Sequence, residues 1–236
     1  MNNYCIRPDY KPNKLNLTLD DISGQTYWNS DRLKSALYYQ YYVYQIAYRL
    51  LKEKKLNSVL DMGCGIARKL EAIHKHLPDL EISGIDQNSA IEFCIKNYSY
   101  GKWYATDLGK PMFFPEISPD LIICSDVIEH FPDPDILLNY IKLYTKANTL
   151  VLISSPERIY LHGMDVDSPS NKNHIREWNF VEFENYMKES RFSVLEHKLC
   201  LPAKLNFSKI AYHEIFKRWL KGQKLFYNQY VLLKVS

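Results

Sequence analysis

Short apolar runs alternate along this chain with segments of helical spacing. The runs fall at residues 57–61, 80–85, 101–105, 120–124 and 148–153. Between them, apolar side chains recur every three or four residues, as on the buried face of a helix. The run at 120–124 is apolar on both faces, as a central strand of a parallel sheet should be. This alternation predicts an α/β fold with a parallel sheet and helices on both faces.

The last part of the chain adds two further strands. Residues 192–196 and 227–235 are rich in β-forming side chains. Asn179 and Glu182 have the spacing of a capping box, which predicts that a helix begins there and precedes the strand at 192–196. The complete pattern predicts a Rossmann-like, seven-stranded, mostly parallel sheet.

Two parts of the chain lie outside the alternation. Residues 1–56 form an N-terminal helical lid or accessory segment, and 57–236 form the main domain with a helical insertion at about 198–224. Apolar and aromatic side chains recur at helical spacing in the first part: Leu37, Tyr41, Tyr44, Tyr48 and Leu51. Such a helix either packs on the sheet or covers a ligand with its tyrosines, since tyrosine has an apolar body and a polar tip.

Composition narrows the class of protein. The 236 residues carry a net charge of only +3, which does not argue for nucleic acid as a partner. No stretch is long and apolar enough to span a membrane, and the first residues lack an apolar signal core, so we expect a cytoplasmic protein. The five cysteines are scattered without a C-x-x-C pair, so we expect reduced thiols and no metal site.

The predicted insertion is basic. Residues 198–224 contain seven lysines and arginines and one acid, Glu214. Such a segment is either a solvated lid helix or a surface that attracts an anionic substrate, with at most a weak contact to acidic lipid headgroups. It lacks the aromatic platform of an RNA-binding motif. The oligomeric state stays open.

A glycine turn follows the first predicted strand. Asp61 stands two residues before Gly63, and Gly65 follows after Cys64. Glycines at these positions let the backbone turn tightly and approach a ligand closely. A dinucleotide fingerprint requires a third small residue, but Arg68 is found there. A nicotinamide-dependent oxidoreductase is therefore the weaker of two interpretations.

The turn resembles motif I of the class I S-adenosylmethionine-dependent methyltransferases, and a second acid, Asp86, follows about 20 residues later. The resemblance implies S-adenosylmethionine as cofactor and a last strand that pairs antiparallel. It places Asp61 near the methionyl amine and sulfonium, Asp86 on the ribose hydroxyls and Asp107 on the adenine amino group, although Asp107 could also be an ordinary loop acid. The implied cofactor-binding residues are Asp61, Gly63, Cys64, Gly65, Asp86, Gln87, Asp107, Leu108, Ser125 and Asp126.

The segment from Ser125 to Phe131 resembles a family segment that borders the methyl group and the substrate. Within it, His130 is a candidate base or substrate contact, or a structural residue. His174, in the long loop after the fifth strand, is the second and preferred candidate base. A hydroxyl acceptor needs such a base, whereas a neutral amine does not.

The same long loop concentrates Arg158, His162, His174 and Arg176. It resembles the corresponding loop of methyltransferases that act in cell-surface polysaccharide synthesis. Because arginine forks suit phosphate and carboxylate groups, we expect Arg158, His162 and Arg176 to bind a small anionic acceptor. In the alternative interpretation, Arg176 and Glu177 pair to fasten the loop.

The sequence thus predicts methyl transfer to a hydroxyl or amine of a small anionic molecule. A sugar nucleotide or surface-glycan precursor is the leading acceptor, and a phosphorylated small metabolite is the alternative. A non-catalytic module that binds S-adenosylmethionine is a further alternative from a different functional class.

Overall fold

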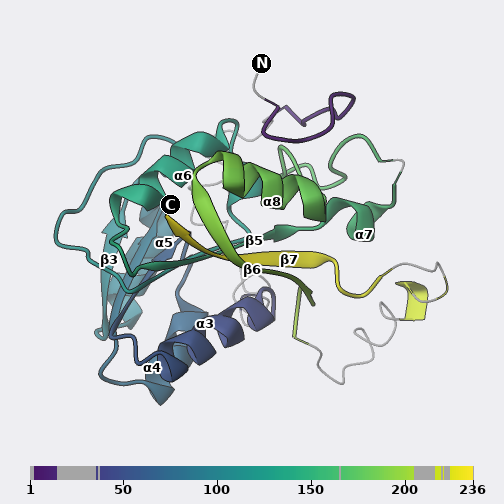
Figure 1. Ribbon diagram of the computed structural model, residues 1–236. Coiled ribbons are helices and arrows are strands. Elements are labelled where there is room, and N and C mark those ends of the chain that lie inside the picture. The colour runs from purple at the N-terminus through teal and green to yellow at the C-terminus, as the bar shows by residue number, and fades with distance from the viewer. Residues whose placement is uncertain are drawn as a thin grey trace.

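A single central sheet carries helices on both faces (Figure 1). The computed structural model describes residues 3–14, 36, 38–164, 166–204, 216–218, 220 and 224–235. The strands are β1 Ser58–Met62, β2 Glu81–Asp86, β3 Gly101–Ala105, β4 Leu121–Ser125, β5 Leu150–Pro156, β6 Phe192–Cys200 and β7 Asn228–Val235.

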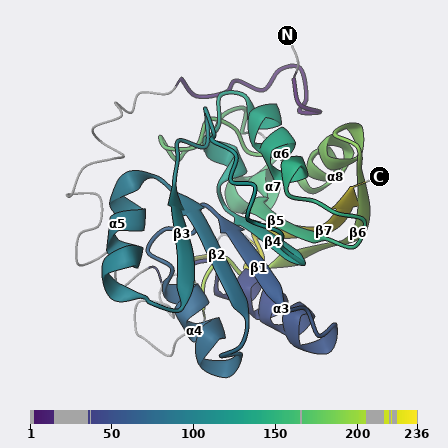
Figure 2. The ribbon, with the colours of Figure 1, turned by 90° about the vertical axis from the view of Figure 1, so that its left-hand side faces the viewer.

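The seven strands lie in the order β3-β2-β1-β4-β5-β7-β6. The first five are parallel, and β7 lies antiparallel between β5 and β6 (Figure 2). This confirms the predicted Rossmann-like sheet and its antiparallel last strand. The order of the strands reverses between β1 and β4. In open α/β sheets, ligands bind at the carboxyl ends of the strands beside such a reversal.

Two apolar cores lie on opposite faces of the sheet. The helices are α3 Tyr41–Glu53, α4 Arg68–His76, α5 Asn88–Asn97, the 3-10 turn η1 Ile128–His130, α6 Pro134–Leu143, α7 Arg158–His162 and α8 Phe180–Glu189. Buried side chains of α3, α4 and α5 form one core with the sheet, and those of α6 and α8 form the other. Each strand of the centre contributes alternate side chains to both cores, which explains its apolar character on both faces.

The observed strands extend further than predicted at two places. β5 continues to Pro156 and β6 to Cys200, because both residues pair with Asn228 at the start of β7. Residues 198–200 are therefore strand and not the beginning of an insertion. Most of the predicted insertion, and residues 15–35 of the predicted lid, lie outside the described residues.

The described part of the N-terminus packs on the long loop after β5. The Trp178 ring nitrogen donates to the carbonyl of Tyr4 over 2.9 Å, and the Asn13 side-chain amide donates to the carbonyl of His174 over 2.9 Å. In Figure 1 this segment runs along the top of the molecule near α7 and α8. None of the described helices has the length and apolar character needed to cross a membrane.

The capping box at the start of α8 is present. The Asn179 side chain accepts from the backbone N–H of Glu182 over 2.9 Å, and the Glu182 carboxylate accepts from the backbone N–H of Asn179 over 2.9 Å. The same carboxylate pairs with Arg158 at 2.8 Å, so this cap also connects α8 to α7. The local sequence signal and the tertiary contact reinforce one another here.

Replacing Asn179 by alanine should lower the free energy of unfolding by about 1 kcal/mol, because one N-terminal backbone donor of α8 loses its acceptor. Asn179→Asp keeps a side-chain oxygen as acceptor at the cap and serves as the matched control. Chemical denaturation of the three proteins measures the difference. Equal stability of the wild type and Asn179→Ala would contradict a stabilising role for the cap.

Candidate functional site

The glycine turn lies at the carboxyl end of β1, where the strand order reverses. Gly63 has a φ of 80°, and its N–H donates to the carbonyl of Ile85 at the end of β2 over 2.8 Å. A Cβ atom on Gly63 would lie 2.4 Å from a methyl carbon of Val127, which follows β4. The turn is thus held between its two neighbouring strands, and both conformation and space require glycine there.

Asp86 fixes the same turn from the end of β2. One carboxylate oxygen accepts from the N–H of Gly65 and the other from the N–H of Gln87, both over 2.7 Å. Burial raises the pKa of Asp86, while these two hydrogen bonds oppose that rise. Cys64 is buried within the turn, and burial raises the pKa of its thiol. Gly65, Cys64, Asp86 and Gln87 therefore lie together, as predicted for a cofactor cradle.

Asp61 lies beneath the turn with only 1% of its surface exposed. The Tyr44 hydroxyl of α3 donates to Oδ2 over 2.7 Å, but Oδ1 has no hydrogen-bond partner among the described residues. Burial raises the pKa of this carboxyl to about 7, against the opposing effects of Tyr44 and Lys69. A buried acceptor without a donor suits a ligand that brings a positive charge or a donor of its own.

Helix α3 packs on the sheet, and of its tyrosines it is Tyr44 that reaches the site. Tyr42 and Tyr48 instead line a hollow of about 480 Å³ between α3, the end of β6 and the beginning of β7. None of the predicted site residues lines that hollow. The hollow lies away from the glycine turn. We therefore do not assign it as the cofactor site, although it is large.

The loop after β3 leaves two interpretations of Asp107 open. The side chain is exposed, and its carboxylate accepts from the N–H of Gly109 over 2.8 Å, as a loop acid does. Leu108 packs partly buried against the core formed with α6 and α8. The predicted contact of Asp107 with adenine stays a prediction.

Ser125, the last residue of β4, and Asp126, which follows it, join a polar cluster at the end of the strand. Ser154 donates its hydroxyl to the Asp126 carboxylate over 2.5 Å, and the Asn228 amide donates to the same oxygen over 3.1 Å. The Ser125 and Ser154 hydroxyls are 2.8 Å apart. Asp126 itself has a φ of 53°, a conformation that few residues other than glycine and asparagine adopt without support. Asn228 was missed by the sequence analysis because only the insertion of β7 beside β5 brings it here.

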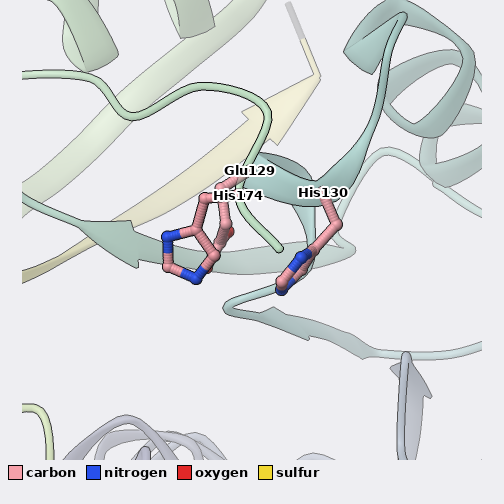
Figure 3. A group of neighbouring side chains, drawn as sticks. All are labelled: Glu129, His130 and His174. Atoms are coloured by element: carbon pink, nitrogen blue, oxygen red, sulfur yellow. The ribbon is translucent and has the colours of Figure 1, made fainter. Parts of the chain in front are cut away.

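Both candidate bases lie close together beyond β4 (Figure 3). The rings of His130 and His174 are 4.9 Å apart and nearly perpendicular. His130 Nδ1 lies 2.7 Å from the carbonyl of Asn173. Burial, and secondarily the neighbouring His174, lower the pKa of His130 to about 4. His130 is therefore neutral at physiological pH.

A buried carboxylate holds the second histidine. Glu177 Oε1 lies 2.5 Å from Nδ1 of His174, and Oε2 lies 2.8 Å from Nε2 of His162. Burial alone would raise the pKa of Glu177, but the hydrogen bonds from His162 and His174 outweigh it and lower the pKa to about 2. Glu177 therefore orients both imidazoles. The alternative interpretation, in which Glu177 pairs with Arg176, is wrong in its partner, because Arg176 donates to the carbonyls of Phe131 and Pro132.

Glu129 is an acid in this region for which the sequence predicted no role. Its side chain is fully buried, and neither carboxylate oxygen makes a well-formed hydrogen bond with a described residue. Burial and the nearby Asp126 hold its pKa well above the usual range, while a contact with Ser155 acts in the opposite direction. Its position beside a motif histidine was the only available signal, because burial is not visible in a sequence.

Arg158 and Arg176 are turned into the protein. Arg158 is 2% exposed and donates to the carbonyl of Glu177 and to the Glu182 carboxylate, each over 2.8 Å. Arg176 is 6% exposed and donates to the carbonyls of Phe131 and Pro132, also over 2.8 Å.

Both guanidinium groups thus fasten the loop after β5 to the rest of the molecule. This favours the fastening alternative over direct contact with an acceptor, although the partners of Arg176 are backbone carbonyls and not Glu177. His162, bound to Glu177, belongs to the same network. A short helix, α7, also occupies the first part of the segment that was expected to be loop.

Comparison with known proteins places this arrangement in context. A family model described as a methyltransferase domain matches residues 36–197. No curated protein matches the sequence. The plantazolicin methyltransferase BpumL in complex with SAH is 20% identical, covers 87% of this chain and 84% of its own, and has a TM-score of 0.57.

Two further solved structures share the fold. The plantazolicin methyltransferase BamL, in complex with a triazolic desmethylPZN analog and SAH, is 14% identical over 88% of each chain, with a TM-score of 0.61. An S-adenosylmethionine-dependent methyltransferase from Clostridium acetobutylicum is 14% identical over 82% of this chain and 90% of its own, with a TM-score of 0.56. The chain belongs to the methyltransferase-domain family and is an S-adenosylmethionine-dependent methyltransferase.

Proposed function

We propose that this enzyme methylates a hydroxyl group of a small anionic acceptor, with a sugar nucleotide or surface-glycan precursor as the leading class. The observation that carries the choice of a hydroxyl is the pair His130 and His174, which lie beyond the end of β4. The phosphorylated small metabolite stays the alternative acceptor. The hydroxyl of such a metabolite would also need a group that takes its proton.

The described residues fit the cofactor. Asp61 offers a buried oxygen without a donor, suited to the cationic methionyl end. Asp86 lies beside the glycine turn, where its carboxylate can accept from ribose hydroxyls. Ser125 and Asp126 close the same edge from β4. When bound, S-adenosylmethionine supplies a methyl group on a positively charged sulfur. The sulfonium is already a good leaving group, so the protein does not need a residue to activate it.

The protein must then orient the acceptor oxygen and take its proton. His174 is held by Glu177 through Nδ1, so its other nitrogen has a defined direction. This orienting carboxylate makes His174 the stronger of the two candidate bases. His130, with its pKa lowered to about 4, is a weak base but can accept a hydrogen bond.

The anionic charge of the acceptor is supported by the sequence resemblance and by the basic composition of residues 198–224. Arg158 and Arg176 contribute to acceptor binding through the loop that they hold. An amine acceptor is the second candidate for the reacting atom. Two structural neighbours are plantazolicin methyltransferases, so a natural product of that kind belongs among the acceptors to be screened.

Asp86→Ala should weaken binding of S-adenosylmethionine by about 1.5–3 kcal/mol, the range expected for lost hydrogen bonds to a charged group. The loss has two origins, since the carboxylate also supports the glycine turn. Calorimetric titration measures it, with Asp79→Ala as control because Asp79 is an exposed acid remote from the turn. Unchanged affinity in Asp86→Ala, or tight binding of NAD by the wild type, would contradict the assignment of the cradle.

Binding of S-adenosylmethionine should strengthen between pH 6 and pH 8. The pKa of Asp61 is about 7, so its carboxyl is largely protonated at pH 6, and a cationic ligand favours the ionised form. Binding at pH 6 should therefore release a proton, which calorimetry in buffers of different ionisation enthalpy detects. Asp61→Asn should abolish the proton release that comes from Asp61. Any protons that S-adenosylmethionine itself releases on binding should still be detected. Identical proton release in both proteins would exclude Asp61 as the group responsible.

His174→Gln should lower turnover by about 10²–10⁴, the usual range for general-base assistance, without changing cofactor affinity. His76→Gln, an exposed histidine at the end of α4, is the matched control. If His174→Gln and His130→Gln both retain the turnover and pH profile of the wild type, neither assists, and an amine acceptor becomes the better hypothesis.

A further inference from the structure

The buried Glu129 carboxylate has no evident structural role. It is fully buried, and neither of its oxygens makes a well-formed hydrogen bond with a described residue. A contact with the Ser155 hydroxyl can engage only one of the two carboxyl oxygens, whether or not Glu129 is protonated. A buried ionisable group is normally paired with a counter-charge or bound to a metal ion.

The two neighbouring histidines are arranged with one nitrogen each as hydrogen-bond donor. A backbone carbonyl only accepts, so Nδ1 of His130 carries the proton that bonds to Asn173. Nε2 of the neutral His130 ring is left with a lone pair.

The same holds for His174. Its Nδ1 donates to Glu177, and its Nε2 accepts from the side-chain amide of Asn171 at 2.8 Å. The direction of that amide is fixed, because its oxygen accepts from the N–H of Asn173 over 3.0 Å. Histidines that bind metals are oriented in this way, with the distant ring nitrogen hydrogen-bonded to a carboxylate or a carbonyl.

The three side chains converge. One carboxylate oxygen of Glu129 and one ring nitrogen from each of His130 and His174 lie within 4.8 Å of one another (Figure 3). The backbone adds rigidity, since the carbonyl of Glu129 accepts from the N–H of Ile175 over 2.8 Å and so joins η1 to the loop. In a tetrahedral site the ligand atoms are about 3.4 Å apart, so binding would draw the three atoms inward by about an ångström.

We propose that Glu129, His130 and His174 bind a divalent transition-metal cation. Two imidazoles and one carboxylate suit Zn²⁺, Fe²⁺ or Mn²⁺ and leave at least one coordination position open. The cation takes the place of the Asn171 amide on His174, and the exposed Asn171 side chain turns outward and gives up its bond to the Asn173 N–H. This inference concerns the side chains alone and stands apart from the identity of the acceptor.

The consequence for catalysis rests on the proposed function. An acceptor hydroxyl that binds the open position would have its pKa lowered by the cation, so its proton would pass to solvent. Its oxygen would then bond to the methyl carbon as the methyl–sulfur bond breaks, and S-adenosylhomocysteine would leave with that electron pair on sulfur. In the metal-bound protein the imidazoles act as ligands, and the cation replaces His174 as the group that activates the hydroxyl. A requirement for both histidines would then reflect one shared cation.

Titration of the untagged, chelator-treated protein with Zn²⁺ and with Co²⁺ tests the site without any acceptor. We expect one cation per chain, and a visible Co²⁺ spectrum showing nitrogen coordination. Glu129→Gln and His174→Gln should each weaken binding by at least about 100-fold, more than loss of an outer hydrogen bond would. Glu81→Gln and His76→Gln, exposed residues of the same types, serve as matched controls.

Wild-type protein that binds neither cation, or variants that bind as tightly as the wild type, would overturn the proposal. Because Glu129 is buried, its variant is checked for cooperative thermal unfolding, and His174→Gln gives an independent result if Glu129→Gln does not fold. Calorimetry with S-adenosylmethionine on the same samples separates the two ideas: cofactor binding without metal binding rejects the cation site alone. Once an acceptor is known, turnover should fall on chelation and return with added cation, whereas an imidazole base would leave turnover insensitive to chelation.

Discussion

The parallel pairing of β1 with β2 on one side and β4 on the other is the constraint on which the site depends. It brings the carboxyl ends of three strands to one edge of the sheet. The glycine turn after β1, Asp86 at the end of β2 and Asp126 after β4 are therefore neighbours, although they are far apart along the chain. The hydrogen bonds from Gly65 and Gln87 to Asp86 then fix the turn at that edge. Cofactor binding follows from this geometry because backbone and carboxylates are already oriented.

The loop after β5, on the other side of the site, is held by buried charged side chains. Arg158, Arg176 and Glu177 lie in or beside the loop after β5, and each is satisfied by hydrogen bonds inside the protein. Burying such groups is costly unless the partners are complete, and removing one partner leaves the other uncompensated. These hydrogen bonds hold Glu177 in place, where it orients His162 and His174. Both arginines are buried in this arrangement, so neither presents an exposed guanidinium group to a ligand.

The histidine pair unites the two proposals. In the described structure each ring has one nitrogen committed to a protein acceptor, which leaves the other nitrogen with a lone pair. That lone pair can take either a proton or a cation, and the buried Glu129 carboxylate favours the cation. Both possibilities explain why polar groups gather beyond β4, where the acceptor of a methyl group must lie.

The sequence by itself determined the elements, the fold class and the glycine turn with Asp86 beside it, which we propose as the cofactor cradle. These depend on local signals: apolar periodicity defines the strands and helices, Gly63 and Gly65 permit positive φ, and Asn179 with Glu182 caps α8. Asp86 also belongs to this group, because a fixed spacing from the glycine turn identifies it.

Only the tertiary structure decided the partners of the charged and polar side chains. Tyr44 meets Asp61, Asn228 meets Asp126, and Arg176 meets backbone carbonyls that no sequence pattern predicts. The physical reason is that a charged side chain can pair with many different groups at similar interaction energies. Strand order and burial, which arise only when distant segments pack, select among them.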